Sequence, residues 1–146
     1  MGTVIEIPED IRRRMIEHAL EGLPNEACGL LAGPDGGRIE AFYPIRNQDQ
    51  SSVTYRLDGR QQLTVQDEIE AKEWEVLGVF HSHTGSEAYP SATDRERAFW
   101  PYADDGMRIF AKAHHFIVSL QGPEPVVRAF WIEDRDRVNE QEVRVV

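Results

Sequence analysis

The sequence predicts one α/β or α+β domain in which a mixed β-sheet is flanked by about three helices. Three observations support this fold class: short apolar runs of strand length, segments with helical apolar spacing, and clusters of turn residues between them. At 146 residues the chain has the length of one ordinary domain with a substantial core. We find no internal repeat and no linker, so residues 1–146 are expected to form a single domain.

The N-terminal part of the chain carries a strand signal followed by a helix signal. Residues 3–7 alternate between apolar and polar side chains, which predicts a short strand. Pro8 and the two acidic residues after it suit the first turn of a helix. Gly22 and Pro24 should end that helix. Its apolar stripe recurs at steps of four, at Ile11, Met15 and Ala19.

A hairpin, a further strand and a second helix are expected next. Residues 26–33 form a short apolar run, residues 34–37 a tight turn, and residues 38–43 a strand that pairs back. Residues 52–57 predict another strand. Asp58 is the expected N-cap of a surface helix that extends to about residue 74. The thin apolar stripe of this helix consists of Leu63, Val65 and Ile69.

The second half of the chain begins with the strongest strand signal. Residues 74–83 are short and nearly all apolar, which is typical of a strand buried on both faces. Ser91 is the expected N-cap of a helix that stops before Pro101. Residues 100–114 are expected to be a loop with a short helix at residues 107–112.

The C-terminal part predicts a hairpin and a last strand. Residues 116–120 and 126–132 are apolar runs separated by a turn rich in glycine and proline. A charged stretch at residues 133–139 precedes a final short strand at residues 142–146.

Composition narrows the functional classes. The net charge is −10, from 26 acidic and 16 basic residues. A nucleic-acid-binding domain usually carries a basic face, and anionic membranes repel an acidic protein, so neither is an expected partner. No apolar stretch approaches the ~20 residues that span a bilayer, and no signal peptide is visible. The single cysteine, Cys28, cannot form an internal disulfide, which fits a cytoplasmic location.

Two histidines and an aspartate form the most informative pattern. His81 and His83 end the strand at residues 74–83, and residues i and i+2 of a strand point to the same side. Asp94 lies near the start of the following helix, from which its carboxylate can reach the two imidazoles. Two histidines and one carboxylate are a usual ligand set for a catalytic zinc that keeps one position open for water. The sequence therefore predicts one Zn²⁺ site.

Each part of this pattern also has an ordinary structural interpretation. Ser91 and Asp94 stand three residues apart, as the hydroxyl and the acid of a helix capping box do. Capping and a role at the metal are not exclusive, because the serine can cap the helix and still direct its hydroxyl at a substrate.

A catalytic zinc needs a base for its water, and Glu26 is the candidate. It begins an apolar run, where a charged residue calls for an explanation. The alternative is that Glu26 merely lies in a solvated turn after Pro24, as most acidic residues are exposed. The sequence leaves both interpretations open.

These residues together resemble the signature of the JAMM, or MPN-plus, metallopeptidases. That signature reads Glu, then His-Ser/Thr-His, seven residues, Ser, two residues and Asp. The chain matches it at Glu26, His81, His83, Ser91 and Asp94. The block at residues 24–33 and the segment at residues 88–91 resemble the bacterial branch, and the likeness runs through most of the chain. Residues 100–114 depart from the pattern by being longer.

The resemblance implies a fold, an activity and a role for each matching residue. The fold would be of the MPN/JAB type. His81, His83 and Asp94 would bind Zn²⁺, Glu26 would accept a proton from the water, and Ser91 would hydrogen-bond the oxyanion. Glu87 and Tyr89, in the loop over the site, are candidates for substrate contacts.

Within the family, the chain most resembles small stand-alone actinobacterial enzymes that release cysteine from a ubiquitin-like sulfur-carrier protein. This implies the tail of such a carrier as the substrate. Two alternatives remain: a broader isopeptidase that removes ubiquitin-like modifiers, and a non-catalytic MPN-type scaffold. The sequence leaves homo-oligomerisation open.

Other zinc hydrolases fit the sequence less well. A zinc deaminase needs a His-x-Glu motif and a pair of cysteine ligands, and the chain has one cysteine. A thermolysin-like peptidase needs His-Glu-x-x-His on a helix, which is absent from the sequence. Cys28 lies inside an apolar run without an evident base, so covalent catalysis is not expected. Ser82 should point away from the metal, and Asn47 could fix the sheet edge near the site.

Overall fold

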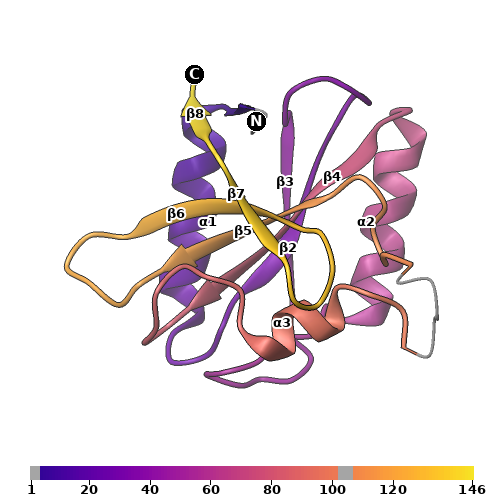
Figure 1. Ribbon diagram of the computed structural model, residues 1–146. Helices are drawn as coiled ribbons and strands as arrows, with labels where there is room; N and C mark the ends of the chain where they lie inside the picture. The colour runs from indigo at the N-terminus through magenta and orange to yellow at the C-terminus, as the bar shows by residue number, and fades with distance from the viewer. Residues whose placement is uncertain (1–3, 102–106) are drawn as a thin grey trace.

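The computed structural model describes residues 4–101 and 107–146 (Figure 1). Its elements in chain order are β1 (Ile5–Ile7), α1 (Glu9–Gly22), β2 (Cys28–Gly33), β3 (Ala41–Ile45), α2 (Gly59–Ala71), β4 (Glu75–His83), α3 (Ala92–Arg97), β5 (His114–Ser119), β6 (Val126–Ile132), β7 (Val138–Gln141) and β8 (Val143–Val145). The described residues thus combine strands with three helices, and the predicted α/β class is confirmed.

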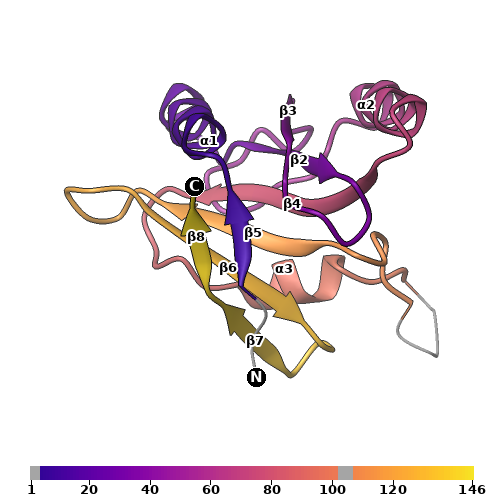
Figure 2. The ribbon, with the colours of Figure 1, turned by 90° about the horizontal axis from the view of Figure 1, so that it is seen from above.

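The strands form two sheets. The larger has the order β3-β2-β4-β5-β6-β7, and the smaller pairs β1 with β8 near the two ends of the chain. Only the contact between β4 and β5 is parallel in the larger sheet, so this sheet is mixed, as predicted. The parallel pair β1 and β8 lies in front of β5 and β6 in the view of Figure 2, and its residues Ile5, Ile7 and Val143 pack in the same cluster as the buried residues of α1.

The helices cover the sheet from opposite sides. Figure 2 shows β3 and β2 standing between α1 and α2. Phe80 of β4 packs in the cluster formed with α1, whereas its neighbour Val79 packs in the cluster that includes Val65 of α2. Successive residues of β4 therefore face two different cores, which explains why its middle part, residues 76–80, is apolar. No helix in the described part of the chain is long and apolar enough to cross a membrane.

Two predicted elements are wrong. Residues 52–57 do not form a strand: a single bridge joins Leu57 to Asn47, and the Asn47 side chain takes the backbone groups that a neighbouring strand would bind. Residues 107–112 do not form a helix. Their backbone pairs instead with the segment after α3: the Ile109 N–H donates to the Ala98 carbonyl, and the Met107 carbonyl accepts from the Trp100 N–H. The Arg108 side chain also stacks on Trp131 at 4.3 Å. Residues 102–106 of the predicted loop lie outside the described residues.

Three further differences concern the bounds of two strands and the buried face of α2. The hairpin strand lies at Ala41–Ile45 rather than residues 38–43, and Pro44 is tolerated there because β3 is an edge strand. β7 was not predicted: it begins in the charged stretch at residues 133–139 and extends to Gln141, and Arg128 of β6 pairs with Glu140 of β7. Leu63, assigned to the apolar stripe of α2, is 66% exposed, whereas Ile69 is buried as predicted.

Candidate metal centre

β4 brings the two histidines to one face of the sheet. His81 and His83 are 0% and 4% exposed, and they continue the face that begins with Val79. Ser82 points to the opposite side, where its Oγ accepts a hydrogen bond from the backbone N–H of Ala27 at 2.8 Å. The period of two along the strand therefore places the imidazoles together, as the sequence indicates.

α3 supplies the carboxylate through its capping box. The Ser91 Oγ accepts from the Asp94 N–H at 3.1 Å, and the Asp94 Oδ2 accepts from the Ser91 N–H at 2.9 Å. The same Oδ2 atom lies 3.0 Å from His81 Nε2 and 3.1 Å from His83 Nε2. Capping and convergence on the histidines thus occur together, because the cap fixes the direction of the Asp94 side chain.

The three donor atoms form an almost regular triangle. The two Nε2 atoms lie 3.1 Å apart, which closes the triangle whose other edges are 3.0 and 3.1 Å. Tetrahedral zinc with bonds of about 2.0 Å separates its ligand atoms by about 3.3 Å. His81, His83 and Asp94 therefore fit three corners of a tetrahedral site. Their nitrogen and oxygen donors suit zinc or a similar divalent ion.

The tautomer of His83 is fixed by its other nitrogen. His83 Nδ1 lies 2.7 Å from the carbonyl oxygen of Glu87, which can only accept, so Nδ1 carries the proton. In neutral His83 the Nε2 atom then presents its lone pair to the centre. A hydrogen bond of this kind is what orients metal-binding histidines in proteins.

The electrostatics of the cluster favour a cation. Burial alone would raise the pKa of Asp94, but the opposing effect of His81 and His83 holds this pKa well below its usual range. Burial would lower the pKa of His83, but hydrogen bonds to Asp94 and to the Glu87 carbonyl raise it. The ring of Tyr55 stacks on His81 with centroids 4.3 Å apart and restrains the imidazole plane.

Glu26 is buried beside this cluster. It is 5% exposed, so the alternative of a solvated turn is wrong. Burial raises its pKa to about 8, an effect that the charge of His83 opposes and that of Asp94 reinforces. Its Oε1 atom is buried without a hydrogen-bond partner among the described residues. An acid in this environment can exchange a proton near neutral pH.

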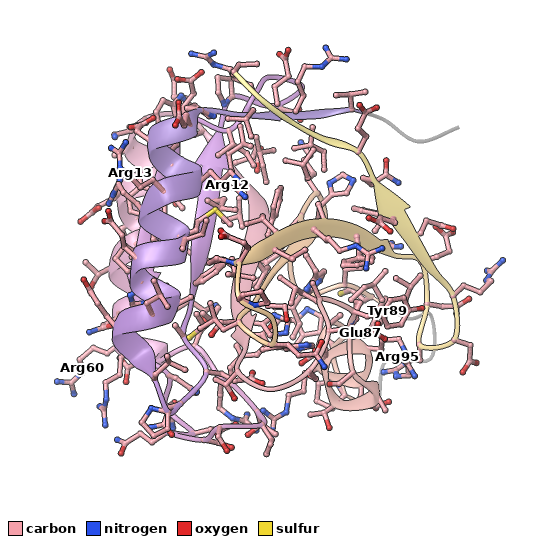
Figure 3. The ribbon with its side chains drawn as sticks, turned by 90° about the vertical axis from the view of Figure 1, so that its left-hand side faces the viewer. Arg12, Arg13, Arg60, Glu87, Tyr89 and Arg95 are labelled. Atoms are coloured by element: carbon pink, nitrogen blue, oxygen red, sulfur yellow. The ribbon has the colours of Figure 1, made fainter. Side chains whose placement is uncertain are left out.

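The loop between β4 and α3 forms one wall of the site. Glu87 binds His83 through its carbonyl, and its side chain is exposed. The Tyr89 ring is partly exposed and packs edge-on against Phe130. Figure 3 shows both side chains on the side of the molecule that carries Arg95, whose guanidinium donates to the carbonyl of Pro90.

The sequence pattern did not identify two contributors to the site. Tyr55 lies in the segment assigned to a strand, and Arg97 donates to both Asp49 and the Tyr55 carbonyl at 2.7 Å. These contacts tie α3 to the loop before α2. No sequence spacing signals them, because their partners are more than 40 residues apart. Tyr55 also borders a largely apolar cavity of about 540 Å³, whose other walls include Val79, Phe99, Phe110 and His115.

Comparison with known proteins agrees with this geometry. The family described as prokaryotic homologs of the JAB domain matches residues 8–133. The CysO-cysteine peptidase of Mycobacterium tuberculosis is 38% identical over 145 residues, covering 98% of this chain and 92% of that protein. The desampylase of Haloferax volcanii is 38% identical over 103 residues, covering 66% of this chain and 74% of that protein.

A solved structure is similar over nearly the whole chain. The solution structure of a protein from Desulfitobacterium hafniense superposes with a TM-score of 0.79 at 36% sequence identity, covering 99% of this chain and 93% of that one. With the family match and the relatives, this likeness defines the class. The chain belongs to the family of prokaryotic JAB domain homologues and is a hydrolase of the JAMM type.

Proposed function

We propose that this protein is a zinc-dependent peptidase that cleaves the amide bond at the C-terminal tail of a ubiquitin-like sulfur-carrier protein and so releases cysteine. The observation that carries the proposal is the triangle of donor atoms at 3.0–3.1 Å near Glu26, whose buried Oε1 atom has no hydrogen-bond partner among residues 4–101 and 107–146. The substrate class is supported by the likeness to the mycobacterial CysO-cysteine peptidase across 98% of the chain.

His81, His83 and Asp94 hold the metal in this proposal. Zinc held there would act as a Lewis acid and would lower the pKa of a coordinated water to about 7. The protein fixes the ligand atoms before binding, through the Glu87 carbonyl on His83 and the capping box on Asp94. Little side-chain ordering is then required on binding, which favours affinity.

Glu26 is the general base and then the general acid. Its carboxylate takes a proton from the attacking water and delivers it to the nitrogen of the leaving cysteine. A group suits this exchange when its pKa lies near the working pH, and the pKa of Glu26 is raised to about 8. A bound cation would lower this value, which favours the carboxylate that begins the reaction.

Ser91 is the donor to the oxyanion that forms when the scissile carbonyl is attacked. Its Oγ accepts from the Asp94 N–H, which uses an oxygen lone pair and leaves the hydroxyl proton to donate elsewhere. Ser91 is exposed at the start of α3, so a substrate can reach the hydroxyl. A donor at such a position contributes about 2.7–4 kcal/mol in the transition state.

Glu87 and Tyr89 contact the substrate tail in this proposal. Both side chains are exposed on the loop whose backbone binds His83. An extended tail ending in Gly-Gly can add alongside a strand edge, and the glycines allow close approach to the walls near the metal.

A second candidate function is the removal of ubiquitin-like modifiers from proteins. The observation that favours it is the 38% identity to the Haloferax desampylase, which extends over 66% of this chain. The two functions share the chemistry and differ in the leaving group, which is free cysteine in one case and a protein amine in the other.

The experiment is an incubation of the zinc-loaded protein with a sulfur carrier bearing a C-terminal cysteine, followed by mass spectrometry. The expected result is a carrier shortened by one cysteine residue, together with free cysteine. Glu26→Gln loaded with the same amount of zinc is the matched control and should release cysteine at least about 10²-fold more slowly. Cleavage of an isopeptide-linked conjugate with no cysteine release would instead support the second function. No cleavage of either substrate by the zinc-loaded protein would contradict both.

A further inference from the structure

All four backbone polar groups of Glu26 and Ala27 form hydrogen bonds. This segment lies just before β2, where the main chain has not yet entered the regular ladder of the sheet. The Glu26 N–H donates to the Ser51 carbonyl at 2.8 Å, and the Ala27 carbonyl accepts from the Ser82 N–H at 3.0 Å. The other two groups bind side chains: the Glu26 carbonyl accepts from Asn47 Nδ2 at 3.0 Å, and the Ala27 N–H donates to Ser82 Oγ at 2.8 Å.

The Glu26 carboxylate, unlike its main chain, is not fully hydrogen-bonded. Its Oε1 atom is buried and has no protein partner within the described ranges. This oxygen is therefore free to bind water or a proton. The hydrogen bonds that hold the residue in place lie on its main chain.

Ser82 connects this main chain to the metal ligands. It stands between His81 and His83 on β4, is fully buried, and faces away from the ligand side. It binds both polar groups of Ala27, one through its hydroxyl and one through its N–H. Any shift of the ligand strand relative to Glu26 would break one of these bonds.

Asn47 connects the same peptide to the loop before α2. Its Nδ2 donates to the carbonyls of Glu26 and Thr54, and its Oδ1 accepts from the N–H groups of Asp49 and Arg56. All of its side-chain polar groups are thus engaged, and the side chain is buried. The loop that it organises carries Tyr55, which stacks on His81.

We propose that Ser82 and Asn47 are positioning residues that clamp the Glu26–Ala27 peptide and so fix the Glu26 carboxylate relative to the metal ligands. The inference rests on the proposed function only in taking Glu26 as the base. Neither residue touches the substrate, and both act through the main chain of Glu26 and Ala27.

The test is Ser82→Ala, with measurements of amide exchange, enzyme kinetics and zinc content. Hydrogen exchange of the Ala27 amide, followed by NMR in the zinc-free protein, should be at least tenfold faster than in the wild type. The kcat for cysteine release should fall about 10- to 100-fold, the range seen when residues that orient a metal site are removed. KM should stay within twofold and zinc should still bind at one equivalent, because the ligands and the substrate surface are retained.

Two variants separate positioning from general loss of stability. Ser82→Thr keeps the hydroxyl and should recover most of the kcat and the slow Ala27 exchange. Cys28→Ala removes another buried hydrogen bond nearby, from Sγ to the Ile45 carbonyl, without touching the clamp. It should lower the melting temperature while leaving kcat within twofold of the wild type.

Asn47→Ala tests the other half of the clamp. It should produce the same pattern of retained KM and lowered kcat, together with faster exchange of the Thr54–Arg56 loop. A kcat for Ser82→Ala within twofold of the wild type would overturn the positioning role even if Glu26→Gln is inactive. An unchanged Ala27 exchange rate would overturn the clamp whether or not the wild-type protein cleaves the carrier adduct. Failure of the wild type on every conjugate would count against the proposed function alone.

Discussion

The site has a ligand side, formed by His81, His83 and Asp94, and a base side, formed by Glu26. The two sides are held in place in different ways. The side chains of His83 and Asp94 are engaged by hydrogen bonds beyond the triangle, and the ring of Tyr55 stacks on His81. On the base side, the backbone around Glu26 is fully bonded and its Oε1 atom is unpartnered in the described part of the chain. Groups that must stay fixed are thus held by their side chains, and the group that must exchange protons is held by its main chain.

The largest expected effect comes from the ligand side. Asp94→Ala removes one corner of the donor triangle and the acidic half of the capping box. We expect no detectable turnover. We also expect roughly 0.1 equivalent of bound zinc or less after dialysis, because the site keeps only two of its three protein ligands. Metal analysis and a peptidase assay check this, with Asp134→Ala as a control far from the triangle in sequence. Full zinc occupancy in the Asp94 variant would remove Asp94 from the ligand set.

Glu26→Gln should separate the two sides. The amide keeps the shape of the side chain but cannot accept the proton, so kcat should fall about 10²- to 10⁴-fold while zinc remains at one equivalent. Parallel measurements of kcat and zinc content check the separation. A variant that loses zinc and activity together would show that Glu26 belongs to the ligand side.

Ser91→Ala has a smaller expected effect on catalysis. Loss of the hydroxyl should lower kcat about 10²- to 10³-fold through the oxyanion and cost about 1 kcal/mol of stability through the cap. Ser91→Thr retains both hydrogen-bonding roles and should restore most of each. If alanine changes the melting temperature and leaves kcat intact, the hydroxyl serves the helix alone.

The smallest effect concerns stability and pH. Because burial raises the pKa of Glu26 from 4.5 to about 8, the folded state binds its proton more tightly than the unfolded state. Stability of the zinc-free protein should therefore fall as pH rises from about 4.5 to about 8. Glu26→Gln lacks this titration, so it should match the wild type in stability near pH 4 and be the more stable of the two above pH 8.

Thermal unfolding in the presence of a chelator, at both ends of this range, measures that difference. Zinc should reduce the stability advantage of Glu26→Gln over the wild type, because a cation stabilises the Glu26 carboxylate. A constant difference between the two proteins across the pH range would mean that Glu26 ionises as an exposed acid does.

Local patterns in the sequence were enough to predict the arrangement of the residues on the ligand side. The i, i+2 spacing of His81 and His83 is read directly from a strand, and the Ser91–Asp94 spacing is read from a helix cap, so neither needs distant contacts. The same kind of signal located α1, α2, β4 and β6, whose periodicity lies within one segment.

Only the tertiary structure determined how Glu26 is held on the base side and whether residues 52–57 and 138–141 form strands. The bonds that hold Glu26 join residues 21 and 55 positions apart, and no periodicity within one segment records such pairs. For the same reason, residues 52–57 lost their predicted strand to the side chain of Asn47, and β7 formed where the backbone of β6 offered an antiparallel neighbour. Local spacing fixes which way a side chain points, but burial and long-range hydrogen bonding depend on what the rest of the chain places beside it.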